Sequence, residues 1–221
     1  METATKLCSV AIGKDGVCIS FREEQTEKLS HAEKLNVFAA QVLKEAGLSF
    51  DLVDAFAVGI GPGSYTGSRI GVSAAKGWAY ALEKRIIGIT TLRTLAQAVL
   101  REQLMDPTEL WPMIDARRME VFTQCFSPSG QIMGDPMPVI LDPEWIAQRP
   151  DRTVVFGDGA DKAEELWSGE KNIVHLSGIT SSARHMIAVA EQRYNSREFD
   201  DLAYLVPQYG KPANVAQPRK Q

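Results

Sequence analysis

The sequence is poor in cysteine and has no excess of basic charge. Its three cysteines, Cys8, Cys18 and Cys125, are widely spaced and form no C-x-x-C pair. Because they cannot all be paired, this usage fits a protein of the reducing cytosol better than a disulfide framework. The formal net charge of -4 at pH 7 gives no general attraction for nucleic acid or for an anionic membrane. Any RNA contact is therefore expected to need a local patch or a partner protein.

Long apolar runs are absent as well. No stretch reaches the roughly 18 consecutive apolar residues of a membrane-spanning helix, and charges such as Glu2, Lys6 and Asp15 occupy the place of a signal peptide. We therefore expect a cytoplasmic protein without a membrane segment. With 221 residues, of which 44% are hydrophobic, the chain can bury one large core or two small ones.

The residue patterns of several enzyme classes are also missing. Zinc peptidases place two histidines on one helix face in H-E-x-x-H, but His31, His175 and His185 are far apart in the sequence. For His31 we expect a capping or surface role, and for His185 a partly buried structural one. No G-x-S-x-G elbow occurs either, although spacing alone does not exclude a Ser-His-Asp triad. We accordingly predict no catalytic, cofactor-binding or metal-ligating residues.

Short strands alternate with helices along the first half of the chain. The pattern predicts a hairpin turning at Asp15-Gly16, a helix from Ser30 to Ala46, a strand over residues 54–60, a helix over 67–82, a strand over 85–90 and a further helix. Strand-helix-strand-helix order implies a parallel sheet with right-handed crossovers.

A polar stretch around Pro107 interrupts the pattern, and the second half then repeats the order of the first. It predicts a hairpin over residues 111–126, an edge strand over 131–141, helices over 143–148, 160–167 and 181–194, and strands over 153–156 and 172–176. We therefore predict an α/β fold of two ribonuclease H-like halves. The domains would span residues 1–104 and 105–221, the second being smaller and ending in a mobile tail past Tyr209.

The stretch GPGSYTGSRIGVSAAKGWAYAL, residues 61–82, opens with a glycine-rich turn. Neither the Walker A frame nor G-x-G-x-x-G fits it, because Thr66 stands where the third glycine would be and no Lys-Ser or Lys-Thr pair follows. Lys76 lies too far along the helix to reach a phosphate at the helix N-terminus. We interpret Gly61-Pro62-Gly63 as a turn and expect Ser64 or Thr66 to cap the helix, although the turn amides could still attract an anion.

The helix that follows has small side chains on nearly every face. Gly71 and Gly77 each cost up to about 1 kcal/mol of helix propensity relative to alanine, so something must compensate. Small residues let another backbone approach closely. The residues leave two explanations open, which are packing inside the chain's own domain and packing against a second subunit, and they favour the first.

Residues 61–71 followed by Ala75-Lys76-Gly77 resemble the signature of the TsaB (YeaZ) family, with Tyr65 in place of Phe and Ser68 in place of Leu. Shorter similar stretches are found at residues 8–11, 31–33, 57–63, 115–121, 157–160 and 207–209. The family's first strand usually has several apolar residues before an Asp-Thr-Ser turn, whereas Met1 directly precedes Glu2 here. We therefore expect a shortened strand or a shifted start. In kinases of this fold the equivalent acidic turn serves the nucleotide phosphates and metal, so the resemblance allows Glu2 to be its remnant, but we favour a solvated charge.

The resemblance implies an actin-like, Hsp70-like fold and a non-catalytic scaffold subunit of the complex that installs threonylcarbamoyl on the adenosine beside the anticodon of tRNA. In that complex TsaD performs the transfer and holds a metal, TsaC makes the threonylcarbamoyl-adenylate, and TsaE is an ATPase. ATP and metal are thus expected on partner subunits. The implied partners are TsaD in a heterodimer, TsaE in a ternary complex, a second copy through the same surface, and tRNA indirectly.

The resemblance also favours the interface explanation of the small-residue helix. The predicted interface residues are Arg69, Ile70, Ser73, Ala74, Gly77 and Trp78. The alternative function is an independent actin-fold ATPase or a glycoprotease-like peptidase. In an ATPase, Asp158 would lie in a turn that contacts adenosine, but we prefer a helix cap by Asp158 or Asp161. We expect Arg117 and Arg118, in a hairpin turn, to be solvated. The oligomeric state, the stoichiometry, a nucleotide at the subunit boundary and the tRNA-contacting residues stay open.

Overall fold

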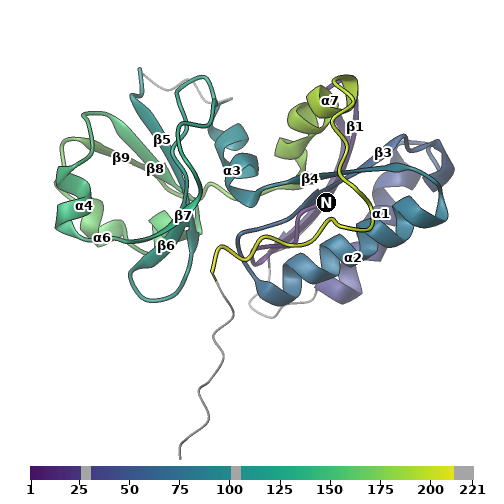
Figure 1. Ribbon diagram of the computed structural model, residues 1–221, viewed down its shortest axis with the longest axis horizontal. Helices are drawn as coiled ribbons and strands as arrows, with labels where there is room; N and C mark the ends of the chain where they lie inside the picture. Colours follow the sequence, from purple (N-terminus) through teal and green to yellow (C-terminus); the bar gives the residue numbers. More distant parts are fainter. Residues whose placement is uncertain (26–30, 101–105, 212–221) are drawn as a thin grey trace, which may run out of the picture.

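Two lobes, each built around a β-sheet, make up the computed structural model, which describes residues 1–25, 31–100 and 106–211 (Figure 1). The second lobe holds a five-stranded sheet in the order β7-β6-β5-β8-β9. Its strands are β5 (Glu109–Asp115), β6 (Glu120–Thr123), β7 (Met137–Ile140), β8 (Thr153–Phe156) and β9 (Ile173–Leu176). The β5, β6 and β7 pairings are antiparallel, whereas β8 runs parallel to both β5 and β9.

The first lobe has the same strand order as the second when Met1 and Glu2 are counted as its central strand. Strands β1 (Leu7–Lys14) and β2 (Val17–Gln25) form an antiparallel pair, and β3 (Ala55–Gly59) and β4 (Arg85–Ile89) form a parallel pair. Met1 and Glu2 join the two pairs. Glu2 exchanges two backbone hydrogen bonds of 2.8 and 2.9 Å with Ser9, and Gly59 donates its N–H to the Met1 carbonyl at 2.9 Å. The predicted repetition of one unit is confirmed, and the central strand of this lobe consists of these two residues.

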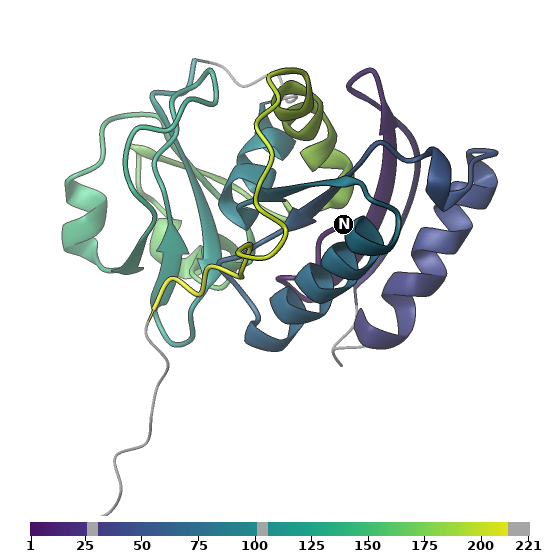
Figure 2. The same cartoon turned by 45° about the vertical axis from the view of Figure 1, so that its right-hand side comes forward.

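Helices cover both faces of the first-lobe sheet (Figures 1 and 2). On one face lie α1 (His31–Glu45) and α2 (Tyr65–Ala81), and on the other lies α7 (Ile187–Asn195), which continues the 3-10 helix η2 (Ala183–Met186). The remaining helices are η1 (Phe50–Leu52), α3 (Thr91–Val99), α4 (Pro143–Ala147), α5 (Asp158–Asp161) and α6 (Glu164–Trp167). The predicted helix over 160–167 is thus two short helices. Among the described residues no helix has the length and apolar content needed to span a bilayer.

The position of α7 corrects the predicted domains. The sequence assigned every residue after 105 to the second domain, but η2 and α7 pack on β1 and β4 of the first lobe. Ile87 and Ile89 of β4 form a core cluster with Met186 and Val189, while Ile86 belongs to the core under α1 and α2. Because β4 is buried on both faces, it needs this second helical layer. The predicted boundary between residues 104 and 105 itself lies in the range 101–105, outside the described residues.

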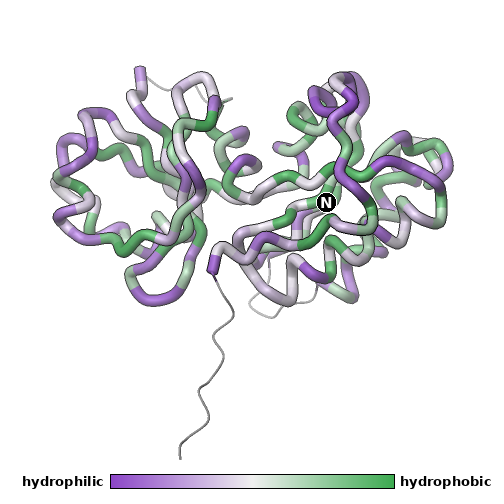
Figure 3. Tube along the Cα trace, viewed as in Figure 1, coloured by the Kyte–Doolittle hydropathy of each residue, from purple (hydrophilic) through white to green (hydrophobic). Residues whose placement is uncertain are grey.

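Apolar residues gather in the strands of both lobes, and the outer turns are more hydrophilic (Figure 3). Sequence periodicity placed the helices well, since α2 begins two residues before the expected start. Ser64 caps it as expected, because its Oγ accepts the Gly67 N–H at 3.1 Å. The predicted cap at Ser30 and most of the predicted mobile tail fall on residues 26–30 and 212–221, which lie outside the described residues.

Glu2 is fully buried, so the expectation of a solvated charge is wrong. It lies in the central strand position, and Oε1 accepts the backbone N–H groups of Thr3 at 2.8 Å and Ala4 at 2.7 Å. The Thr91 hydroxyl donates to Oε2 at 3.2 Å. Burial raises the pKa of Glu2 despite these hydrogen bonds, because removal from water penalises the charged form.

The glycines of α2 differ in their surroundings. An alanine Cβ at Gly67 would lie 2.0 Å from the Thr3 carbonyl oxygen, and one at Gly71 would lie 2.3 Å from the Thr3 hydroxyl. At Gly77, by contrast, a Cβ would meet no described atom beyond its own stretch of helix within 4 Å. Internal packing therefore accounts for Gly67 and Gly71, but it gives no reason for Gly77.

This difference predicts opposite effects of two alanine substitutions. Gly67→Ala should lower the free energy of unfolding, because the new methyl group collides with a backbone carbonyl in a packed interior. Gly77→Ala should raise it by up to about 1 kcal/mol, because alanine favours an exposed helix position over glycine. Urea unfolding of both variants tests this, and a destabilised Gly77→Ala would contradict the open surroundings of that residue.

Burial of Glu2 predicts a pH dependence of stability. The unfolded carboxyl ionises near its ordinary pKa of about 4.5, whereas the folded one keeps its proton to higher pH. The contribution of Glu2 to the free energy of unfolding therefore falls as the pH rises from about 4.5 through the raised pKa of the folded state. Glu2→Gln should remove this fall, since an amide can accept from Thr3 and Ala4 and donate to the Thr91 hydroxyl.

Urea unfolding of the wild type and of Glu2→Gln between pH 4.5 and 8 measures the effect. The stability of the variant relative to the wild type should increase with pH. A difference that stays constant over the range would show that Glu2 has the same pKa in the folded and unfolded chain.

Candidate functional site

The outer face of α2 is open to solvent. Of the six predicted interface residues, Arg69, Ser73 and Gly77 are exposed and share this face with Thr66 and Tyr80. No part of the described second lobe covers it, and α2 packs on β3, β4 and α1. Three of the six predicted interface residues are therefore open to solvent, and the interface itself stays a prediction.

The other three predicted interface residues form a half-buried ridge along α2. Ile70, Ala74 and Trp78 are spaced four residues apart and pack against the core of the first lobe. The Trp78 ring lies 5.3 Å from the Phe50 ring and 5.8 Å from the Phe56 ring, measured between centroids. These side chains hold the helix on its own lobe and are only partly exposed to solvent.

Arg69 is exposed but engaged within the chain. Its Nε donates to the Tyr209 hydroxyl at 2.8 Å, and its guanidinium carbon lies 4.0 Å from the centroid of the Tyr65 ring. The Tyr65 and Tyr209 rings themselves lie 4.9 Å apart. Pro207-x-Tyr209 is one of the family-like stretches of the sequence, but its return to α2 is visible only in the structure.

Residues 200–211, which we call the C-terminal strap, run alongside α2 (Figures 1 and 2). Lys76 Nζ donates to the carbonyls of Ala203 at 2.9 Å and Leu205 at 3.1 Å, and the Leu205 side chain is buried. The Gln208 N–H donates to the Ile60 carbonyl at 2.6 Å. The lysine of the Ala75-Lys76-Gly77 motif therefore binds the strap.

The strap ends on the second lobe. Lys211 forms an ion pair with Glu120, and its Nζ lies 5.8 Å from the centroid of the Phe122 ring. An alanine Cβ at Gly210, where φ is +69°, would lie 2.6 Å from that ring. The described residues beyond Tyr209 thus contact the β5-β6 hairpin and link the two lobes.

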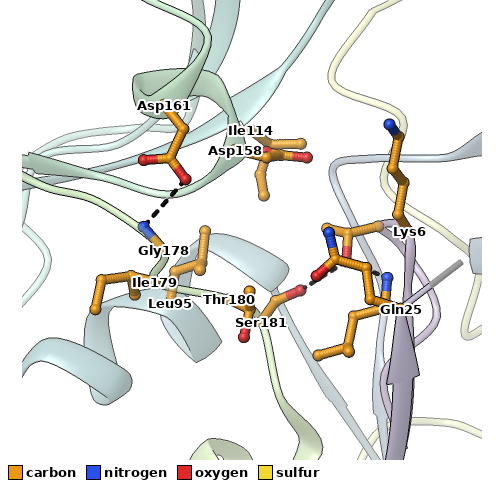
Figure 4. A pocket seen from close by; sticks show the side chains of 12 residues that line it. Lys6, Gln25, Leu95, Ile114, Asp158, Asp161, Gly178, Ile179, Thr180 and Ser181 are labelled. Atoms are coloured by element: carbon orange, nitrogen blue, oxygen red, sulfur yellow. Dashed lines mark hydrogen bonds between the residues drawn. The ribbon is translucent and has the colours of Figure 1, made fainter. Parts of the chain in front are cut away.

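A cavity of about 190 Å³ opens between the lobes (Figure 4). Lys6 and Gln25 line it from the first lobe, and Asp158 and Asp161 line it from the second. Ligand sites for drug-sized molecules are commonly larger, from roughly 300 to 1,000 Å³. Among the described residues no group of three or more His, Cys, Asp or Glu side chains is arranged to hold a metal ion.

The two aspartates of the cleft do not cap a helix, contrary to our expectation. α5 begins at Asp158 after Gly157 and has no side-chain cap. Asp158 Oδ1 instead accepts the Asp115 N–H at 3.0 Å, and desolvation raises the pKa of Asp158. Asp161 accepts from His175 Nε2 at 2.9 Å and from the Gly178 N–H at 3.2 Å. Both carboxylates hold the second lobe together across positions that are distant in sequence.

The histidines lie apart from one another. His31 is fully buried at the start of α1, so neither a capping nor a surface role is right. Its Nε2 donates to the Thr5 carbonyl at 2.9 Å, and burial lowers the pKa of His31. His185 is half-buried in η2, as expected. Arg117 and Arg118 are exposed in the β5-β6 turn, also as expected.

Comparisons with known proteins agree with this architecture. Residues 24–209 match the family described as "TsaD: tRNA N6-adenosine threonylcarbamoyltransferase". A protein of Escherichia coli (strain K12) named "tRNA threonylcarbamoyladenosine biosynthesis protein TsaB" is 30% identical, the match covering 95% of this chain and 92% of the relative. A protein of the same name from Haemophilus influenzae is 33% identical, with coverages of 95% and 91%.

Solved structures give the same result. The structure described as "YeaZ from Pseudomonas aeruginosa" superposes with a TM-score of 0.77 at 26% identity, over 94% of this chain and 96% of that one. The predicted actin-like arrangement of two related halves is thus confirmed. The chain belongs to the TsaB (YeaZ) family.

Proposed function

We propose that the chain serves tRNA threonylcarbamoyladenosine biosynthesis as a non-catalytic scaffold, and that it binds a TsaD-type subunit through the outer face of α2. The similar proteins of Escherichia coli and Haemophilus influenzae are named for this pathway. The matching family description names the threonylcarbamoyltransferase TsaD. A partner related to this chain in fold would present a helix of the same kind.

The observation that carries the proposal is the open glycine of α2. Gly77 lowers helix stability by up to about 1 kcal/mol relative to alanine, and a Cβ built at this position would meet no described atom outside its own stretch of helix within 4 Å. A glycine in such a position allows a second backbone to approach closely. The neighbouring Ser73 is also small and exposed, so a partner helix can lie along this stripe.

The acidic side chains near the junction of the lobes are bound within the chain, which supports a scaffold role. The carboxylates of Asp158 and Asp161 bind groups of their own lobe, and Glu2 binds Thr3, Ala4 and Thr91. The proposal gives the chain no cofactor of its own and assigns ATP and metal to the partner subunits. We further propose that TsaE joins in a ternary complex and that a second copy of the chain can bind the same face. Contact with tRNA is indirect, and the complex works in the cytoplasm.

A charge placed on α2 should prevent the association. Ser73 is exposed, so Ser73→Arg should leave folding intact while a desolvated, bulky cation weakens binding to the TsaD of the same organism at least tenfold, about 1.4 kcal/mol. Calorimetry and light scattering on the mixed proteins measure this. Threonylcarbamoyl transfer to tRNA in the reconstituted system should fall in parallel.

The matched control is Ala40→Arg on the exposed face of α1. It adds the same charge to the same lobe and should bind as the wild type does. If the wild-type chain and TsaD do not associate, with or without TsaE and ATP, the proposal is wrong. Tight binding and turnover of ATP by the isolated chain would instead favour an independent ATPase.

A further inference from the structure

The C-terminal strap holds one tyrosine out into solvent on a fixed backbone. Tyr204 is 82% exposed, yet its own N–H and that of Ala203 donate to Asp201 Oδ1 at 3.1 and 2.7 Å. The Leu205 N–H donates to the Asp201 carbonyl at 2.9 Å. The backbone that carries the Tyr204 ring is therefore held by hydrogen bonds, although the ring itself is exposed.

Lys76 of α2 fixes the same segment from the other side. Its Nζ donates to the carbonyls of Ala203 and Leu205, the residues on either side of Tyr204. Leu205 is buried in the first-lobe core. The flanking carbonyls are bound and the next side chain is buried, so the backbone around Tyr204 is held while its ring extends into solvent.

Two more exposed apolar side chains belong to the two segments that Lys76 joins, α2 and the strap. Tyr80 is 79% exposed and lies four residues after Lys76, hence on the same side of α2. Val206 is 63% exposed and lies two residues after Tyr204 on the strap. We call Tyr80, Tyr204 and Val206 the tyrosine patch. Rigidly held aromatic side chains are common anchors of protein interfaces, because they bury a large area and lose little conformational freedom on binding.

The charges around the patch indicate the chemistry of its partner. The only cations of α2 are Arg69 and Lys76, and the helix contains no acidic residue. Arg69 binds Tyr209 and Lys76 binds the strap carbonyls. Both cations are thus turned to the strap, and the face between them is uncharged. An apolar surface with uncharged hydrogen-bonding groups would fit it.

We propose that the tyrosine patch is the second half of the partner-binding surface, with Tyr204 as the anchor that inserts into the TsaD-type subunit. Lys76 is the positioning residue that holds this anchor in place. The inference rests on the proposed function, because the patch continues the α2 stripe: Tyr80 lies three residues after Gly77 and seven after Ser73, so all three share one side of the helix. The Ala75-Lys76-Gly77 motif then serves one surface, with Lys76 ordering the strap and Gly77 admitting the partner.

Binding of the full-length chain to TsaD tests the anchor. Tyr204→Ala should raise Kd at least tenfold without changing the free energy of unfolding, because the ring is exposed in the free chain. Ile140→Ala is the matched control, since Ile140 is 65% exposed on the edge strand of the second lobe, and its Kd should stay within twofold of the wild type.

A double-mutant cycle tests the positioning role of Lys76. Lys76→Met keeps the apolar stem but removes the donors, so it should speed hydrogen exchange of the strap amides and weaken binding. In the Tyr204→Ala background the same substitution should cause less than a twofold further loss. A full additional loss would show that Lys76 does not act through Tyr204.

The outcomes separate this inference from the proposed function. If Ser73→Arg abolishes binding while Tyr204→Ala binds as the wild type, the anchor is refuted and the scaffold proposal stands. If the wild type fails to bind TsaD, the proposed function is refuted first. If Tyr204→Ala disrupts only self-association of the chain, the patch faces a second copy, and TsaD as its occupant is refuted.

Discussion

The fold of the first lobe depends on the close approach of α2 and its preceding turn to the segment Glu2–Ala4. An alanine Cβ at Gly59 would lie 2.4 Å from the Glu2 carboxylate, one at Gly63 would lie 2.1 Å from the Ala4 carbonyl, and one at Gly67 would lie 2.0 Å from the Thr3 carbonyl. The Ser64 N–H donates to the Ala4 carbonyl, and the Thr3 hydroxyl donates to the Gly67 carbonyl. The glycine-rich turn that suggests a phosphate loop in the sequence instead makes room for the chain itself, because Gly63 approaches the turn after the central strand and Gly61 approaches the Gln208 carbonyl of the strap.

This contact determines which face of α2 is free. Gly67 and Gly71 point inward at Thr3, so the opposite side of the helix, with Ser73 and Gly77, points outward. The strap then lies along one edge of that outward side and is held there by Lys76 and Arg69. Because α2 is fixed by its inner face, its outer side and the C-terminal strap form one surface, although the two segments are more than a hundred residues apart in the sequence.

The two lobes also share an arrangement of acidic residues. Glu2 ends the central strand of the first lobe and Asp115 ends β5, the central strand of the second. Glu2 binds backbone N–H groups of the turn that follows it, and Asp115 likewise accepts the Arg117 N–H at 2.8 Å and pairs with Lys162. In both lobes, therefore, a carboxylate stabilises the first turn after the central strand.

The sequence by itself determined the order and type of nearly all elements, the cap at Ser64 and the family, because these depend on local spacing and on a contiguous motif. It did not determine which of the six predicted interface residues are exposed, and the structure separates Arg69, Ser73 and Gly77 from the half-buried Ile70, Ala74 and Trp78. Only the tertiary structure decided that Glu2 is buried, that α7 belongs to the first lobe and that Lys76 binds the strap. Each of these facts is a contact between residues far apart in the chain, such as Lys76 with Ala203 or Met186 with Ile87. Such contacts leave no periodic trace in the sequence, since they depend on which sheet face or helix side needs to be covered after the elements have packed.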